Sequence, residues 1–125
     1  MSITLFAIAA GGAVGAVSRY LTSQWAYSVM GKSFPFGTLL VNFTGSFAAG
    51  LLTVLLIERL NVAPELRAAI LIGFLGSFTT FSAFSYETLS LVSGGDYIKA
   101  VSNVLISLFV CLTACWFGIL LGRQL

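Results

Sequence analysis

The chain has 125 residues, of which 58% are hydrophobic and only 8% are charged, with a net charge of +2 and no histidine. A soluble domain carries about 25% charged residues, so this composition indicates a membrane protein. The small net charge argues against nucleic acid as a partner, because the six Lys and Arg residues are spread along the whole chain.

Four apolar segments are each long enough to cross a bilayer, which takes about 20 helical residues. They cover residues 3–25, 36–57, 68–92 and 100–122, with short connections between them. The first segment has no basic residue in front of it, so we expect a retained membrane helix rather than a signal peptide. The sequence predicts an all-α membrane protein with one four-helix domain over residues 1–125.

Basic residues are balanced between the two ends of this bundle. Four spans place both termini on one side together with Arg59, Arg67 and Arg123, while the other side carries Lys32, Lys99 and Arg19. With three basic residues on each side, the positive-inside rule does not favour either orientation in the membrane. The charge pattern therefore leaves both a single orientation and insertion in both orientations open.

Small residues recur at a spacing of four on several spans, including Gly11 with Gly15, Ser46 with Gly50, and Gly118 with Gly122. Such pairs let helix backbones approach closely. They are suited to packing within one subunit and to association between subunits. Because four short helices cannot enclose an aqueous path by themselves, we expect any pathway to need a second subunit.

Uncharged polar residues form a stripe on two of the spans, and polar groups inside a membrane are functional candidates by default. The second span carries Thr38, Asn42 and Ser46, and the fourth carries Asn103, Ser107 and Cys111. Amide and hydroxyl groups donate hydrogen bonds without carrying charge. They are suited to stripping water from an anion and releasing it again, and equally to bonding between helices.

The third span contains a polar and aromatic stretch, GFLGSFTTFSAFSYE at residues 73–87, where a plain span would be aliphatic. Glycines and hydroxyls such as that of Thr80 loosen a helix, which is tolerated only beside protein or a water-filled cavity. Phe81 and Phe84 share a helix face, and the electropositive rims of their rings suit a small anion. As an alternative, both phenylalanines fill the protein core.

The charges furthest inside the spans are Arg19 and Glu87, which we expect at the mouth of a pathway or paired with each other. The sequence offers no nucleophile with a base, no metal-binding cluster and no phosphate-binding loop, so we predict that the protein is not an enzyme. Cys111 and Cys115 share a helix face but lack a second pair for a zinc site, and are expected to be small buried residues.

Three motifs in this sequence resemble the Fluc/CrcB family of fluoride channels. They are GGAVGAVSRY at residues 11–20, FGTLLVN at residues 36–42, and the stretch at residues 73–87. The resemblance implies an antiparallel, dual-topology homodimer in the bacterial inner membrane, surrounded by lipid. It implies passive export of fluoride from the cytoplasm, through two pores.

The resemblance also implies roles for particular residues. Backbone carbonyls at a break in the third helix would hold a structural sodium ion, and Gly76 and Thr79 match these ligands. Phe81 and Phe84 match the family's phenylalanine box, Asn42 its pore asparagine, and Ser107 its serine on the fourth helix. The sequence departs from the usual family pattern at three positions: Ala83, Asn103 and Cys111.

Two other readings remain. A proton-coupled exporter like the small multidrug resistance proteins would share the size and topology, but it depends on an acid in the first span, which this chain lacks. A membrane subunit that only packs against partners would tolerate replacement of its polar stripes by Ala and Leu.

Overall fold

The computed structural model describes residues 2–125, and the regular elements in that range are helical. In chain order they are α1 (Ser2–Met30), α2 (Phe36–Thr53), η1 (Val54–Arg59), α3 (Pro64–Arg67), η2 (Ala68–Phe74), α4 (Leu75–Phe78), α5 (Phe81–Ser93) and α6 (Tyr97–Gln124). The segments η1 and η2 are π-helical continuations of α2 and α3. Four stretches are long and apolar enough to cross a membrane, as the sequence predicts: Ser2–Met30, Phe36–Arg59, Pro64–Ser93 and Tyr97–Gln124.

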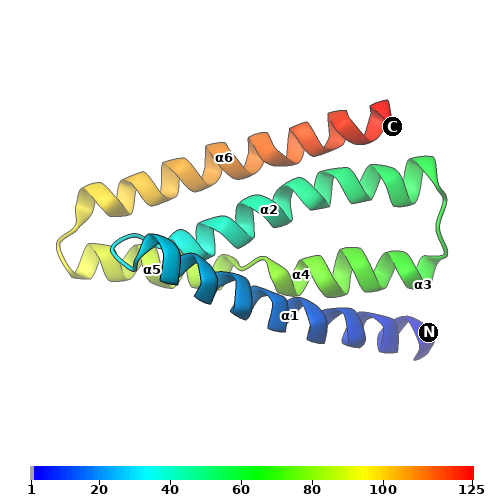
Figure 1. Ribbon diagram of the computed structural model, residues 1–125, viewed down its shortest axis with the longest axis horizontal. Helices are drawn as coiled ribbons and strands as arrows, with labels where there is room; N and C mark the ends of the chain where they lie inside the picture. Colours follow the sequence, from blue (N-terminus) through cyan, green and yellow to red (C-terminus); the bar gives the residue numbers. More distant parts are fainter. Residues whose placement is uncertain (1) are drawn as a thin grey trace.

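The four spans run side by side, with the N-terminus, the C-terminus and the connection before α3 at one end (Figure 1). At the other end, Gly31 (φ 83°) follows α1 and Gly95 (φ 84°) lies in the turn before α6. Both take left-handed backbone conformations, which glycine adopts without steric cost. Lys99 Nζ donates to the carbonyl of Ser33 at 3.1 Å and so joins the two turns at this end.

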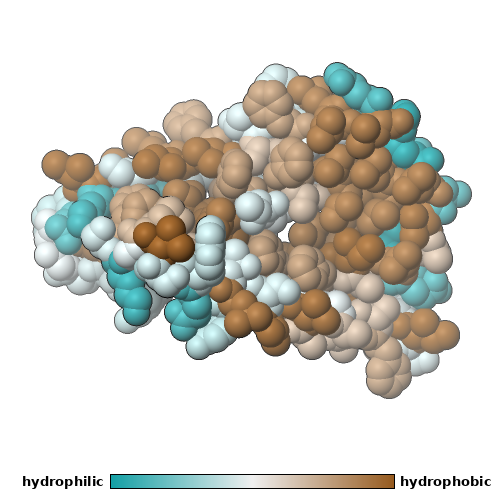
Figure 2. All heavy atoms as spheres, in the orientation of Figure 1, coloured by the Kyte–Doolittle hydropathy of each residue, from teal (hydrophilic) through white to brown (hydrophobic). Residues whose placement is uncertain are grey.

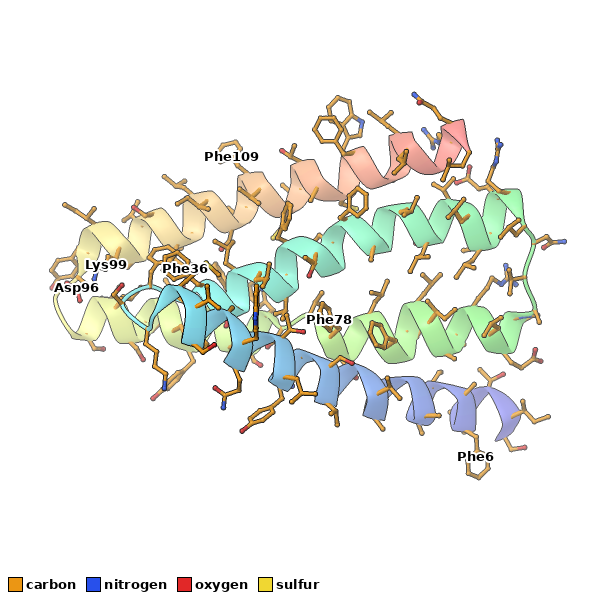
Figure 3. All side chains as sticks on the ribbon, in the orientation of Figure 1. Phe6, Phe36, Phe78, Asp96, Lys99 and Phe109 are labelled. Atoms are coloured by element: carbon orange, nitrogen blue, oxygen red, sulfur yellow. The ribbon has the colours of Figure 1, made fainter. Side chains whose placement is uncertain are left out.

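Large apolar side chains cover the outside of the bundle, and small residues fill much of its interior. Phe6 is 75% exposed and Phe109 is 70% exposed, and both point away from the neighbouring helices (Figure 3). Ala26, Ala100 and Ala114 are buried. In Figure 2 apolar residues cover much of the middle of the visible face, and hydrophilic ones gather toward its ends. This distribution suits a protein whose surface meets lipid.

Glycines let two pairs of spans approach to backbone contact within the chain. A Cβ at Gly11 would meet the carbonyl of Ala69 in η2, and one at Gly15 would meet the carbonyl of Phe74. A Cβ at Gly118 on α6 would likewise meet the backbone of Phe47 on α2. These small residues therefore pack helices of one subunit together.

Candidate functional site

The third span changes conformation near its middle, at Thr79 and Thr80. Helix α4 ends before Thr79 (φ −88°, ψ 159°) and α5 begins after Thr80 (φ −151°, ψ 114°), and both residues are extended. The Thr79 hydroxyl donates to the carbonyl of Leu75 at 2.9 Å. The Thr80 hydroxyl accepts from the amide of Ala83 at 3.1 Å and caps α5, as threonine commonly does at a helix start.

The side chain of Asn42, on α2, binds the backbone of Thr80 at two points. Its Nδ2 donates to the Thr80 carbonyl at 3.1 Å, and its Oδ1 accepts from the Thr80 amide at 2.8 Å. A carboxamide carries a donor and an acceptor in the same arrangement as a peptide group. Asn42 therefore takes the place of the helical partners that the extended residue Thr80 lacks.

These contacts withdraw the usual hydrogen-bond donors from two backbone carbonyls. In a continuous helix the Gly76 carbonyl would accept from the Thr80 amide, and the Thr79 carbonyl from the Ala83 amide. Here the Thr80 amide binds Asn42, and the Ala83 amide binds the Thr80 hydroxyl. A Cβ placed at Gly76 would meet nothing within 4 Å, so the space beside this residue is open. Backbone carbonyl oxygens without a hydrogen-bond donor are suitable ligands for hard cations.

Arg19, on α1, reaches the C-terminal end of α4. Its Nε donates to the carbonyl of Ser77 at 2.9 Å, across 58 positions of sequence. The last carbonyls of a helix carry partial negative charge and lack helical donors. The guanidinium group therefore stabilises the end of α4, next to the extended residues.

A cavity of about 450 Å³ lies beside the extended segment. It brings together seven of the residues to which the family resemblance or the hydroxyl run assigns a role in the site. They come from α2, the third span and α6: Asn42, Gly76, Thr79, Thr80, Phe81, Phe84 and Ser107. The rings of Phe81 and Phe84 lie 5.5 Å apart, centre to centre, at 42°. Phe81 is 77% exposed in the single chain, so the cavity is open along this side.

Glu87 lies away from this cavity, in a polar cluster between three helices. Its carboxylate accepts from the hydroxyl of Thr38 at 2.5 Å and from that of Tyr27 at 3.0 Å. Glu87 and Tyr27 line a second cavity, of about 470 Å³, together with Lys32 and Asp96. The structure therefore places Thr38 and Glu87 in contact with each other, and Arg19 against Ser77.

On α6, Ser107 and Asn103 differ in their surroundings. Ser107 lines the cavity of Asn42, whereas Asn103 is only 2% exposed and faces α5. Asn103 Nδ2 donates to the hydroxyl of Thr88 at 2.8 Å, and its Oδ1 accepts from Ser107 at 3.4 Å. Cys111 and Ser46 also line this cavity.

Comparison with known proteins places this arrangement in a family. The family model described as "CrcB-like protein, Camphor Resistance (CrcB)" matches residues 6–119, which include all of the residues that line the two cavities. This chain belongs to the CrcB-like family.

Relatives of this CrcB-like chain carry the name "Fluoride-specific ion channel FluC". One, from Methylococcus capsulatus, is 51% identical over 125 residues, and the chain spans 55% of its length. A relative from Geobacter metallireducens is 46% identical over 123 residues, which are 98% of this chain and 99% of the relative. One from Coxiella burnetii is 47% identical over 126 residues and is covered completely, as is this chain. These names are those of channels, in agreement with the prediction that the protein is not an enzyme.

Two polar residues of this CrcB-like chain were missed by reasoning from its sequence. Tyr27 lies beyond the expected end of the first span, because α1 continues to Met30. Thr88 donates to the carbonyl of Phe84 at 2.7 Å and accepts from Asn103. A signal for Thr88 was present, since it lies on the same helix face as Phe81 and Phe84, four residues beyond the latter.

Proposed function

We propose that this protein is a fluoride-selective passive ion channel, which lets fluoride leave the cytoplasm and so reduces its toxicity. The observation that carries this proposal is the similarity over the whole chain to relatives named as fluoride-specific ion channels. Four apolar helices of membrane-spanning length make it a multi-pass membrane protein. We place it in the bacterial inner membrane, where export from the cytoplasm takes effect.

The chemistry of the cavity supports an anion as the occupant. Its polar lining consists of uncharged groups, among them the amide of Asn42 and the hydroxyls of Thr80 and Ser107. A neutral donor binds an anion less tightly than a charged one, and conduction requires that the ion also leave. The rims of Phe81 and Phe84 add weak positive potential without a formal charge.

We propose that the channel is an antiparallel homodimer of dual topology with two pores. The cavity is open along the side where Phe81 is exposed, so that a second copy of the chain completes its wall. The even distribution of basic residues supports insertion of the chain in both orientations. Membrane lipid covers the remaining apolar surface.

We propose that the extended pair Thr79 and Thr80 forms the break in the third helix and that a structural sodium ion binds beside it. The carbonyl oxygens of Gly76 and Thr79 would hold this ion, because their helical donors are bound elsewhere. Two such oxygens from each subunit provide an oxygen-only site, the ligand type that hard cations prefer. When bound, the ion neutralises the partial negative charge of these carbonyls.

The second cavity, lined by Glu87, serves as the vestibule in this proposal. Its wall carries both Lys32 and Asp96, whose opposite charges offset each other. The carboxylate of Glu87 is engaged by Thr38 and Tyr27, so its charge is partly offset by two hydroxyl donors. Arg19 adds positive charge near the middle of the bundle, where it also holds the end of α4.

A flux experiment on the purified protein in liposomes tests these proposals. With internal potassium fluoride or potassium chloride and valinomycin present, fluoride should leave far faster than chloride. Equal release of both anions, or no release, contradicts a fluoride channel. Repeating the assay after purification without sodium tests the structural ion: fluoride release should fall and recover when sodium is restored.

A proton-coupled exporter of the small multidrug resistance type is not supported by the relatives described above. A fluoride current without an imposed proton gradient separates the two mechanisms, because an exporter coupled to protons would give none.

A further inference from the structure

A chain of hydrogen bonds runs from the cavity through α6 into α5. Ser107 Oγ donates to Asn103 Oδ1 at 3.4 Å, Asn103 Nδ2 donates to Thr88 Oγ1 at 2.8 Å, and Thr88 Oγ1 donates to the Phe84 carbonyl at 2.7 Å. Asn103 is 2% exposed, so water does not compete for its amide in the single chain. The chain links a residue of the cavity wall to the backbone that carries Phe84.

The direction of every bond in this chain follows from its last member. The carbonyl of Phe84 can only accept, so the Thr88 hydroxyl uses its proton there. Thr88 must then accept from Asn103, and only the NH₂ group of the amide can donate. The amide therefore presents its oxygen to Ser107, and Ser107 must be the donor of that contact.

This direction matters because the hydroxyl proton of Ser107 is then used in the bond to Asn103. With its proton on Asn103, the hydroxyl turns oxygen lone pairs toward the cavity, which do not attract an anion. The Ser107–Asn103 contact of 3.4 Å is the longest of the three and so the weakest. An anion beside Ser107 gains a donor only if this contact opens.

We propose that Asn103 is a positioning residue that competes with the transported anion for the proton of Ser107. It thereby sets how tightly the anion is held beside α6. This inference rests on the proposed function, since it requires an anion to pass Ser107. Asn103 itself is buried and does not line the cavity, so a list of the lining residues alone does not indicate this role.

The test measures initial fluoride efflux from liposomes as a function of internal fluoride concentration. Asn103→Leu keeps the branched shape of the side chain, with a somewhat larger volume, and removes the competing oxygen. Loss of one such hydrogen bond should lower the half-saturating fluoride concentration by about 2- to 10-fold. Thr88→Val removes the group that fixes the amide orientation and should also lower the half-saturating fluoride concentration. Thr88→Ser keeps the hydroxyl and should leave this concentration near the wild-type value.

A double-mutant cycle separates this role from a purely structural one. In a Ser107→Ala background there is no proton to compete for, so Asn103→Leu should leave the half-saturating concentration unchanged. Thr113→Val removes a hydroxyl from a different face of α6, beside Phe109 and Phe43, and serves as the matched control.

An equal shift by Asn103→Leu with and without Ser107 would overturn the proposal. So would the absence of a shift in both Asn103→Leu and Thr88→Val. If Asn103→Leu fails to assemble by size-exclusion chromatography, the comparison of Thr88→Val with Thr88→Ser decides alone. Failure of the wild-type protein to release fluoride would instead contradict the proposed function itself.

Discussion

Replacing Asn42 by alanine should release the extended segment from α2. The change removes both partners of the Thr80 backbone, the donor at 3.1 Å and the acceptor at 2.8 Å. A buried group left without its partner costs about 1–3 kcal/mol. Both bonds are only partly buried, so we take the lower value for each, which gives about 2 kcal/mol in total. Since 1.4 kcal/mol is a factor of ten, local opening at Thr80 should become about 30-fold more frequent.

Amide hydrogen exchange measures this opening directly, because the Thr80 amide is one of the two groups concerned. Exchange at Thr80 should accelerate by about 30-fold in Asn42→Ala, and fluoride efflux should fall while the protein still assembles. Thr44→Ala is the matched control on the same helix, because the Thr44 hydroxyl binds carbonyls of its own helix only. Unchanged exchange at Thr80 in Asn42→Ala, or equal acceleration in both variants, would refute the argument.

Three further changes test other parts of the structure. Phe81→Ile should reduce fluoride efflux by roughly 2- to 10-fold without loss of assembly, since an aromatic contact is worth about 0.5–1.5 kcal/mol; unchanged efflux would contradict a role in the pore. Gly118→Ala should lower the yield and thermal stability in detergent, by about 1–3 kcal/mol for overpacking, whereas Gly94→Ala, whose added Cβ would come no nearer than 3.5 Å to its neighbours, should remain stable. Arg19→Met should cost about 1.5–3 kcal/mol of stability through loss of the charged donor to Ser77; equal melting temperatures would argue against that contact.

The four helices could be predicted from the sequence because long apolar segments specify membrane spans almost by themselves. Their ends were less certain: α1 continues to Met30, and this extension carries Tyr27 to Glu87. The small-residue pairs predict close packing between helices, but they do not identify which helix packs against which. Only the structure assigns Gly11 to η2 and Gly118 to α2, because spacing along one helix does not say which helix faces it.

The candidate site was predicted as a set of residues rather than as a set of contacts. The polar stripe on the second span drew attention to Asn42, and the hydroxyl run drew attention to Thr80. The two residues lie 38 positions apart in the sequence, and nothing in that spacing indicates that they are hydrogen-bonded to each other. Such pairings depend on how the spans pack, which local patterns do not encode.

The extended segment is stabilised by side chains from α1 and α2 and by the hydroxyl of Thr80 itself. Arg19 from α1 binds the Ser77 carbonyl, Asn42 from α2 binds both polar groups of Thr80, and the Thr80 hydroxyl caps α5. Each contact satisfies a group that the extended backbone at Thr79 and Thr80 would leave without a helical partner, which is costly at membrane depth. The same contacts divert the donors that would otherwise reach the carbonyls of Gly76 and Thr79. In the proposed sodium site a bound cation would be the partner of these two oxygens, so the side chains that hold the segment extended would also shape that site.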